Sequence, residues 1–123
     1  MGCAVLLVED DEDVREAICE ELVELGCEVA CAEGALQALA QLRRGLQPDF
    51  ILLDLLLPQM RGTELLRALK AEAAFEPIPV VLMSASVRAA GTTPVLRKPL
   101  RRSQLEQMVG WFGRASPAEG GAR

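Results

Sequence analysis

The chain has 123 residues, half of them hydrophobic, which is enough for one domain with a packed core. Its formal net charge of −5 gives no general attraction to nucleic acid or to an anionic membrane surface. The first apolar run is too short for a secretory signal or a membrane span. We therefore expect a cytoplasmic protein without nucleic-acid or membrane partners.

Strand-like and helix-like segments alternate along the chain. Short apolar runs predict five strands, at residues 4–8, 27–32, 50–54, 79–83 and 94–97. Apolar residues at helical spacing predict helices at 13–25, 35–44 and 62–71, and a final helix capped by Ser103 that runs to Phe112. Residues 1–115 would form the domain, and residues 116–123 read as a flexible tail.

This alternation predicts an α/β fold, a doubly wound five-stranded parallel sheet with helices on both faces. The flavodoxin-like strand order 2-1-3-4-5 would place the first and third strands side by side. The connection between the fourth and fifth strands is short, because only residues 84–93 are available for it. We therefore expect the fourth helix to be shortened or absent, with residues 86–93 forming a mostly non-helical, mobile crossover.

Five polar residues follow the predicted strands: Asp10, Asp11, Asp54, Ser84 and Lys98. The carboxyl ends of parallel strands share one rim, which is where ligands bind in such sheets. Three carboxylates on that rim would repel one another unless they shared a divalent cation, which prefers hard oxygen ligands. A lysine and a hydroxyl beside that cation are donors for an oxyanion. The pattern therefore predicts a site for metal-assisted phosphoryl transfer to a carboxylate.

With these motifs the chain resembles the receiver domain of response regulators in two-component signalling, from about Ala4 to Phe112. The resemblance rests on Val8-Glu9-Asp10-Asp11, on the segment from Asp54 to Gly62, on Ser84-Ala85 and on Lys98-Pro99. Two departures concern the region around the fifth strand. One is the short crossover, and the other is Val95, where receivers commonly carry a Tyr or Phe that reports phosphorylation.

The resemblance implies that Asp54 accepts a phosphoryl group from a histidine kinase or a phosphotransfer protein. It implies that Mg²⁺, with Mn²⁺ as an alternative, is held by Asp10, Asp11, Asp54 and the backbone carbonyl of Leu56. It also implies that Ser84, Lys98 and the backbone of Ala85 bind the phosphoryl oxygens.

A receiver is a signalling domain rather than an enzyme, although it assists its own phosphorylation and dephosphorylation. We expect a stand-alone receiver that switches its binding to an unidentified downstream protein or to a second copy of itself.

Other interpretations stay open at this point. Asp10 and Asp11 could cap the first helix instead of holding a metal. A receiver-like interaction module, in which phosphorylation is incidental, is the main functional alternative. A flavin-binding protein of the same topology would need a phosphate-binding loop where this chain has Glu9 to Asp13. An aspartate-nucleophile phosphatase usually needs a second acid at the position of Leu56.

The cysteines indicate no metal site. Cys3, Cys19, Cys27 and Cys31 include no C-x-x-C pair, and the chain has no histidine. We expect buried, reduced thiols that act as small hydrophobic residues.

Overall fold

The computed structural model describes residues 2–57, 60–85 and 95–113. The strands are β1 (Cys3–Val8), β2 (Cys27–Ala32), β3 (Phe50–Asp54), β4 (Val80–Ser84) and β5 (Val95–Arg97). The helices of the described ranges are α1 (Glu12–Glu24), α2 (Ala35–Arg43), α3 (Gly62–Lys70) and α4 (Arg102–Phe112). Each lies within one or two residues of its predicted position.

The five strands form one parallel sheet in the order β2-β1-β3-β4-β5, as predicted. The register pairs Val8 with Leu53 and Asp54 with Met83, so β1, β3 and β4 end almost level. Ser84 pairs with Arg97 at the end of β5. The residues that follow these strands therefore emerge along one rim of the sheet.

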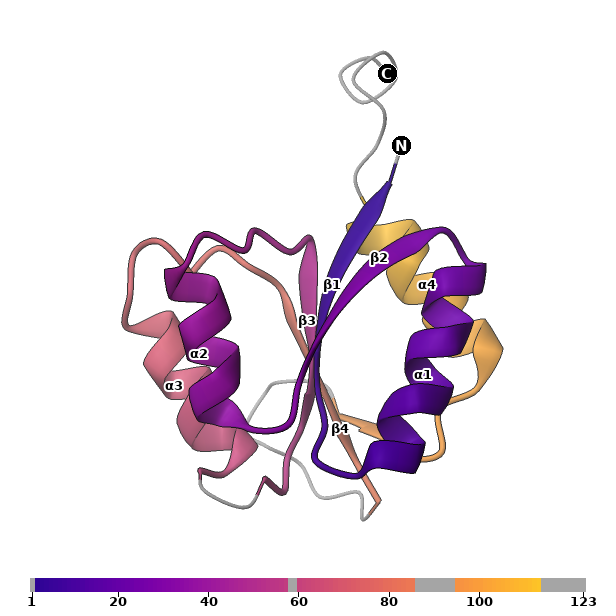
Figure 1. The fold of residues 1–123 in the computed structure, drawn as a ribbon, viewed down its shortest axis with the longest axis horizontal. Helices are drawn as coiled ribbons and strands as arrows, with labels where there is room; N and C mark the ends of the chain where they lie inside the picture. Colours follow the sequence, from indigo (N-terminus) through magenta and orange to yellow (C-terminus); the bar gives the residue numbers. More distant parts are fainter. Residues whose placement is uncertain (1, 58–59, 86–94, 114–123) are drawn as a thin grey trace.

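Helices cover both faces of the sheet, with α1 and α4 on one face and α2 and α3 on the other (Figure 1). Alternate residues of β1 and β3 are buried on opposite faces because a strand has a period of two. Leu6 and Ile51 belong to the core under α2 and α3. Leu7 and Leu52 belong to the core under α1 and α4. Continuous apolar runs such as Phe50 to Leu53 of β3 fit this double burial.

The helix ends show one error in the sequence prediction. Gly26 and Gly45 follow α1 and α2 with φ of 93° and 111°, a backbone region that glycine adopts without strain. The predicted cap Ser103 instead lies inside the first turn of α4, and Arg101 is the N-cap residue. Gln104 Oε1 accepts a hydrogen bond from the Arg101 N–H at 2.8 Å. The side chain three residues later therefore provides an acceptor for the backbone N–H of the N-cap residue.

The cysteines correct the expectation that all four thiols are buried. Cys3 and Cys27 are buried, whereas Cys19 is half-buried and Cys31 is exposed.

The predicted non-helical crossover over residues 86–93 lies outside the described residues, as does the predicted tail over residues 116–123.

Candidate functional site

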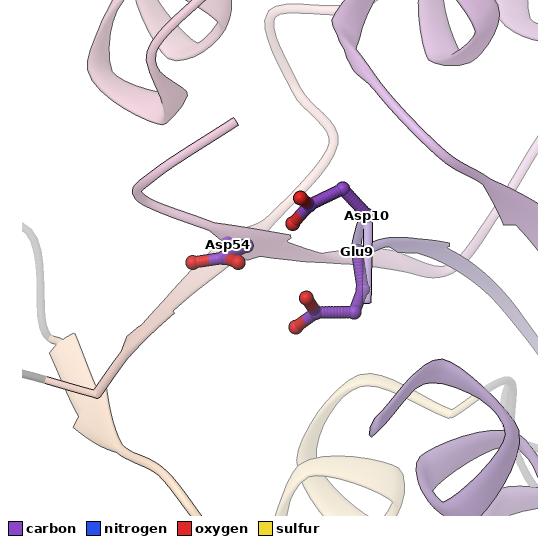
Figure 2. A group of neighbouring side chains, drawn as sticks. All are labelled: Glu9, Asp10 and Asp54. Carbon is purple, nitrogen blue, oxygen red and sulfur yellow. The ribbon is translucent and has the colours of Figure 1, made fainter. Parts of the chain in front are cut away.

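Three carboxylates converge at the C-terminal rim of the sheet. Glu9 and Asp10 directly follow β1, and Asp54 is the last residue of β3, the neighbouring strand. One oxygen from each carboxylate lies within 4.8 Å of the other two, and the side chains of Glu9 and Asp10 extend toward Asp54 (Figure 2). Glu9 and Asp54 are buried and Asp10 is exposed. The group thus combines buried negative charge with an opening to solvent.

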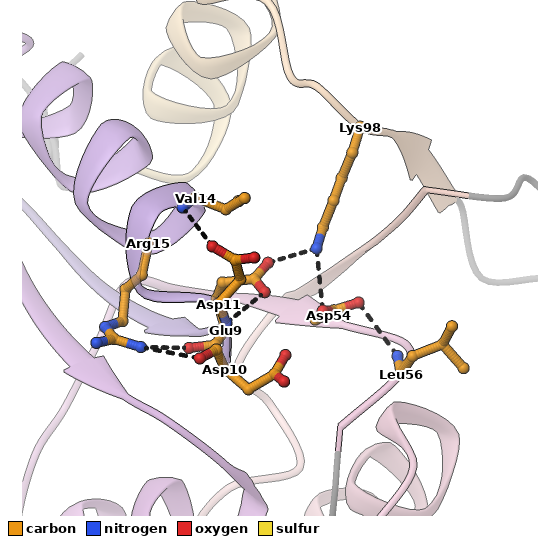
Figure 3. Close-up of polar contacts among 8 residues, drawn as sticks. All are labelled: Glu9, Asp10, Asp11, Val14, Arg15, Asp54, Leu56 and Lys98. Atoms are coloured by element: carbon orange, nitrogen blue, oxygen red, sulfur yellow. Dashed lines mark hydrogen bonds and ion pairs between the residues drawn. The ribbon is translucent and has the colours of Figure 1, made fainter.

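Lys98 provides the positive charge that this group needs. It follows β5, and its Nζ lies 2.5 Å from Glu9 Oε1 and 3.0 Å from Asp54 Oδ2 (Figure 3). The Lys98 side chain is only 16% exposed, so the three charges interact where water screens them weakly. Lys98 therefore joins the end of β5 to the ends of β1 and β3.

Burial and pairing shift the pKa values of two of these groups. Burial raises the pKa of Glu9, although the hydrogen bond from Lys98 opposes this effect. Burial alone would lower the pKa of Lys98, but its hydrogen bonds to Glu9 and Asp54 outweigh it, and the pKa is raised. The Lys98 ammonium is therefore charged at neutral pH.

The backbone after β3 positions Asp54. The Leu56 N–H donates to Asp54 Oδ1 at 3.1 Å, while Lys98 binds Asp54 Oδ2. Gly62 begins α3 against this turn, and its N–H donates to the Leu55 carbonyl at 2.8 Å. A Cβ at Gly62 would lie 2.5 Å from the backbone oxygen of Asp54, so only glycine fits here without a shift. The role predicted for the Leu56 carbonyl stays a prediction.

Asp11 caps the first helix in the structure, and its predicted role as a metal ligand stays a prediction. Its Oδ1 accepts a hydrogen bond from the Val14 N–H at 3.0 Å and caps α1, while its own N–H donates to Glu9 Oε2 at 3.1 Å. Within the described residues, the acidic group suited to a cation contains Glu9 rather than Asp11. The signal for Glu9 was available, because Glu9 and Asp10 are the two residues directly after the first apolar strand.

Arg15 is a site residue that the sequence reasoning missed. Its Nη1 donates to the backbone carbonyl of Glu9 at 2.9 Å and lies 3.5 Å from that of Asp10 (Figure 3). Arg15 belongs to the first turns of α1, so it ties the acidic loop to the helix that follows. No motif distinguished it from an ordinary surface arginine.

Ser84 and Ala85 lie at the same rim, at the end of β4. Ser84 is buried, Ala85 is exposed, and the Ser84 carbonyl accepts a hydrogen bond from the Lys98 N–H at 2.8 Å. Ala85 lines an open cleft of about 520 Å³ together with Lys98 and four acids, Glu9, Asp10, Asp11 and Asp54. The cleft is large enough for a phosphoryl group beside a cation. The roles predicted for Ser84 and Ala85 toward phosphoryl oxygens stay predictions.

The arrangement is matched by a known family of domains. Residues 5–110 fit the family model described as the response regulator receiver domain, which covers most of the chain. The chain belongs to this family. This receiver domain is part of two-component signalling, a system in which receivers interact with histidine kinases and downstream effectors and bind Mg²⁺ in an acidic pocket.

Curated relatives share the domain at moderate identity. Protein PilG of Pseudomonas aeruginosa is 27% identical over 112 residues, which covers 85% of this chain and 82% of PilG. The phosphate regulon transcriptional regulatory protein PhoB of Klebsiella pneumoniae is 39% identical over 85 residues. That match covers 69% of this receiver but only 37% of PhoB.

Solved structures share the fold. The receiver domain of sensor histidine kinase PA1611 from Pseudomonas aeruginosa, with a magnesium ion coordinated in its active site cleft, is 27% identical. It matches with a TM-score of 0.82 over 93% of this chain and 100% of that one. A putative response regulator from Chloroflexus aurantiacus is 26% identical with the same TM-score of 0.82, and the match covers 93% of this chain and 100% of that one.

Val95, which replaces the usual aromatic residue, is half-buried at the start of β5 and packs against the core under α2 and α3. No helix in the described part of the chain has the length and apolar character needed to cross a membrane.

Proposed function

We propose that this receiver domain accepts a phosphoryl group on Asp54, in a reaction that depends on a divalent cation, and that the modification switches partner binding. One observation carries the proposal. The Asp54 carboxylate lies beside the acids Glu9 and Asp10, and the ammonium of Lys98 bridges it to Glu9, in a cleft that opens to solvent.

The proposed cation ligands are Glu9, Asp10, Asp54 and the backbone carbonyl of Leu56. Their carboxylate oxygens converge and are hard donors, which fits Mg²⁺, or Mn²⁺ in its place. We replace Asp11 with Glu9 in this set because Asp11 caps α1. When bound, the cation would offset the repulsion between the acids and an anionic phosphoryl donor.

The covalent step uses Asp54 as the nucleophile. A carboxylate oxygen of Asp54 attacks the phosphorus of a donor such as a phosphohistidine, and the bond between phosphorus and the donor nitrogen breaks. The leaving imidazole keeps the electron pair and takes up a proton. The bond from the Leu56 N–H holds the carboxylate plane in place for this attack.

Lys98 then exchanges partners. It now pairs with two carboxylates, and it would pair with the phosphoryl oxygens once Asp54 carries an acyl phosphate. The Ser84 hydroxyl and the Ala85 backbone would contribute further contacts from the end of β4. These contacts differ between the free and phosphorylated forms, which is the requirement for a switch. The same residues would assist the later hydrolysis of the phosphoryl group.

The proposal is tested by incubating the purified protein with a small-molecule phosphodonor and Mg²⁺ and measuring the intact mass. We expect one added phosphoryl group, lost in Asp54→Asn and without the metal. Asp13→Asn is the matched control, because it removes an exposed acid of α1 outside the cluster. Equal modification of Asp54→Asn would disprove the assignment. A fully unmodified wild type that still binds its partner would favour the interaction-module alternative.

A further inference from the structure

Arg15 of α1 contacts the backbone of the two residues whose side chains begin the acidic group. Its Nη1 donates to the Glu9 carbonyl at 2.9 Å and lies 3.5 Å from the Asp10 carbonyl (Figure 3). Both acceptors are main-chain oxygens rather than carboxylate oxygens. Arg15 therefore holds the path of the chain through Glu9 and Asp10 and leaves their carboxylates to other partners.

The start of α1 directs this side chain toward the acidic loop. Asp11 is the N-cap residue, and the Arg15 N–H donates to the Asp11 carbonyl at 2.9 Å, four residues back along the chain. A long side chain in a helix leans toward the helix N-terminus and covers the turn before its own Cα. The guanidinium of Arg15 is thus placed over the loop that leads into the helix.

The backbone of Glu9 is held at both of its polar atoms. Its N–H donates to the Ala32 carbonyl, at the end of β2, at 3.0 Å, and its carbonyl accepts from Arg15. Glu9 is fully buried, so water replaces a lost partner of its carbonyl poorly. The end of β2 and the start of α1 therefore fix this residue from two directions.

Arg15 and Lys98 act on the acidic group in different ways. Lys98 Nζ pairs with Glu9 Oε1 and Asp54 Oδ2, so it occupies oxygens that a bound cation would use. Arg15 brings a positive charge to the same loop without occupying any of those oxygens. An entering cation would therefore compete with Lys98 but not with Arg15.

We propose that Arg15 is a positioning residue for the divalent-cation site, which holds the backbone of Glu9 and Asp10 so that their carboxylates face Asp54 before the cation binds. Both side chains extend toward Asp54 (Figure 2). Ligands that are already in place bind more tightly, because less conformational freedom is lost on binding. The inference rests on the cation binding in the proposed function and extends it to a residue outside the acidic group.

The charge of Arg15 and its hydrogen bonds predict opposite effects of its removal. Loss of a positive charge near the acids would by itself tighten the binding of a cation. Loss of the contacts with the two carbonyls would weaken it, because Glu9 and Asp10 would no longer be held. The second effect should dominate, because it acts through direct contacts, whereas solvent in the open cleft screens the charge.

The experiment measures the dissociation constant of Mg²⁺ by titration calorimetry on the full chain, under conditions in which each variant is folded by denaturant titration. Arg15→Met keeps an unbranched side chain without a donor and should weaken Mg²⁺ binding by about tenfold. Arg15→Lys keeps a charged donor and should recover most of this loss. Arg15→Gln repeats the test with a neutral side chain if Arg15→Met does not fold, and it should also weaken binding.

Arg67→Met is the matched control, because it removes an exposed arginine from the last turn of α3 and changes the net charge equally. It should leave the dissociation constant within about twofold of the wild type. Unchanged or tighter Mg²⁺ binding after the loss of Arg15, or no recovery in Arg15→Lys, would overturn the proposal, as would a wild type that binds no Mg²⁺. A wild type that binds Mg²⁺ but gains no phosphoryl mass from a small-molecule donor would contradict only the proposed phosphorylation of Asp54.

Discussion

Glu9 Oε1 lies 2.5 Å from Lys98 Nζ, which joins the residue after the first strand to the residue after the last one. Glu9 is buried and shares this ammonium with Asp54. The contact places a third acid in the site that Asp10 and Asp54 form. It also makes Glu9 and Lys98 the residues whose replacement tests the proposed division of roles most directly.

Replacing Glu9 by Gln should weaken Mg²⁺ binding by roughly tenfold, because a hard cation loses a charged ligand. Glutamine keeps the shape of the side chain and an oxygen acceptor for Lys98. The dissociation constant can be measured by titration calorimetry on the wild type and the variant.

Asp11→Ala separates metal binding from helix capping. It should change the Mg²⁺ affinity little, but lower the free energy of unfolding by about 0.5–2 kcal/mol, because the Val14 N–H loses its cap. Denaturant titration measures this loss. If Asp11→Ala weakened Mg²⁺ as strongly as Glu9→Gln, Asp11 would return to the ligand set.

Lys98→Ala should destabilise the protein in the absence of metal by about 3–5 kcal/mol at most, because two buried carboxylates lose their counter-charge. Mg²⁺ should bind more tightly to the variant, because the acids lose a competing positive charge. Melting curves should therefore show a larger stabilisation by Mg²⁺ in the variant than in the wild type. Lys70→Ala serves as the control, because Lys70 contacts only backbone carbonyls far from the acids. An equal effect of Mg²⁺ on both variants would contradict the proposed role of Lys98.

Gly62→Ala should impair the site through the backbone. The new Cβ would meet the Asp54 oxygen at 2.5 Å and the Leu55 Cα at 2.8 Å, and backbone atoms cannot rotate away. We expect a loss of about 1–3 kcal/mol in stability and slower phosphorylation of Asp54.

Gly110→Ala is the matched control for this change. A Cβ at Gly110, within α4, meets nothing within 4 Å, so the substitution should stabilise the protein by about 0.5–1 kcal/mol. A Gly62→Ala protein as stable and as reactive as the wild type would show that the close approach has no consequence.

As the pH is lowered, the Mg²⁺ affinity should begin to fall at a higher pH than it would if Glu9 had the pKa of an ordinary carboxylate. Burial raises the pKa of Glu9 above its usual 4.5, and only the deprotonated form can hold a cation. The affinity should therefore decline as the pH falls through this raised pKa. Titrations of the wild type and of Glu9→Gln across this range isolate the component due to Glu9. A variant with the same pH dependence as the wild type would assign the effect to other groups.

The strands, their order and the location of the site were predictable from the sequence because they depend on local pattern. Apolar runs such as Phe50 to Leu53 cannot be exposed, and their alternation with helical segments allows few topologies. Once the strand order was set, Asp10, Asp54, Ser84 and Lys98 had to share one rim. The family motifs then predicted the chemistry at this rim, which is phosphoryl transfer to a carboxylate.

Only the tertiary structure decided how the three consecutive acids after β1 divide their roles. Glu9, Asp10 and Asp11 are chemically similar neighbours, but Glu9 and Asp10 extend toward Asp54, whereas Asp11 turns to the start of α1. The start of α1 takes Asp11 as its cap, because the Val14 N–H has no partner within the helix. Lys98 and Arg15, brought by β5 and α1, hold Glu9 from two sides. The sequence determined that acids gather at this rim, and long-range packing decided which of them lie close together.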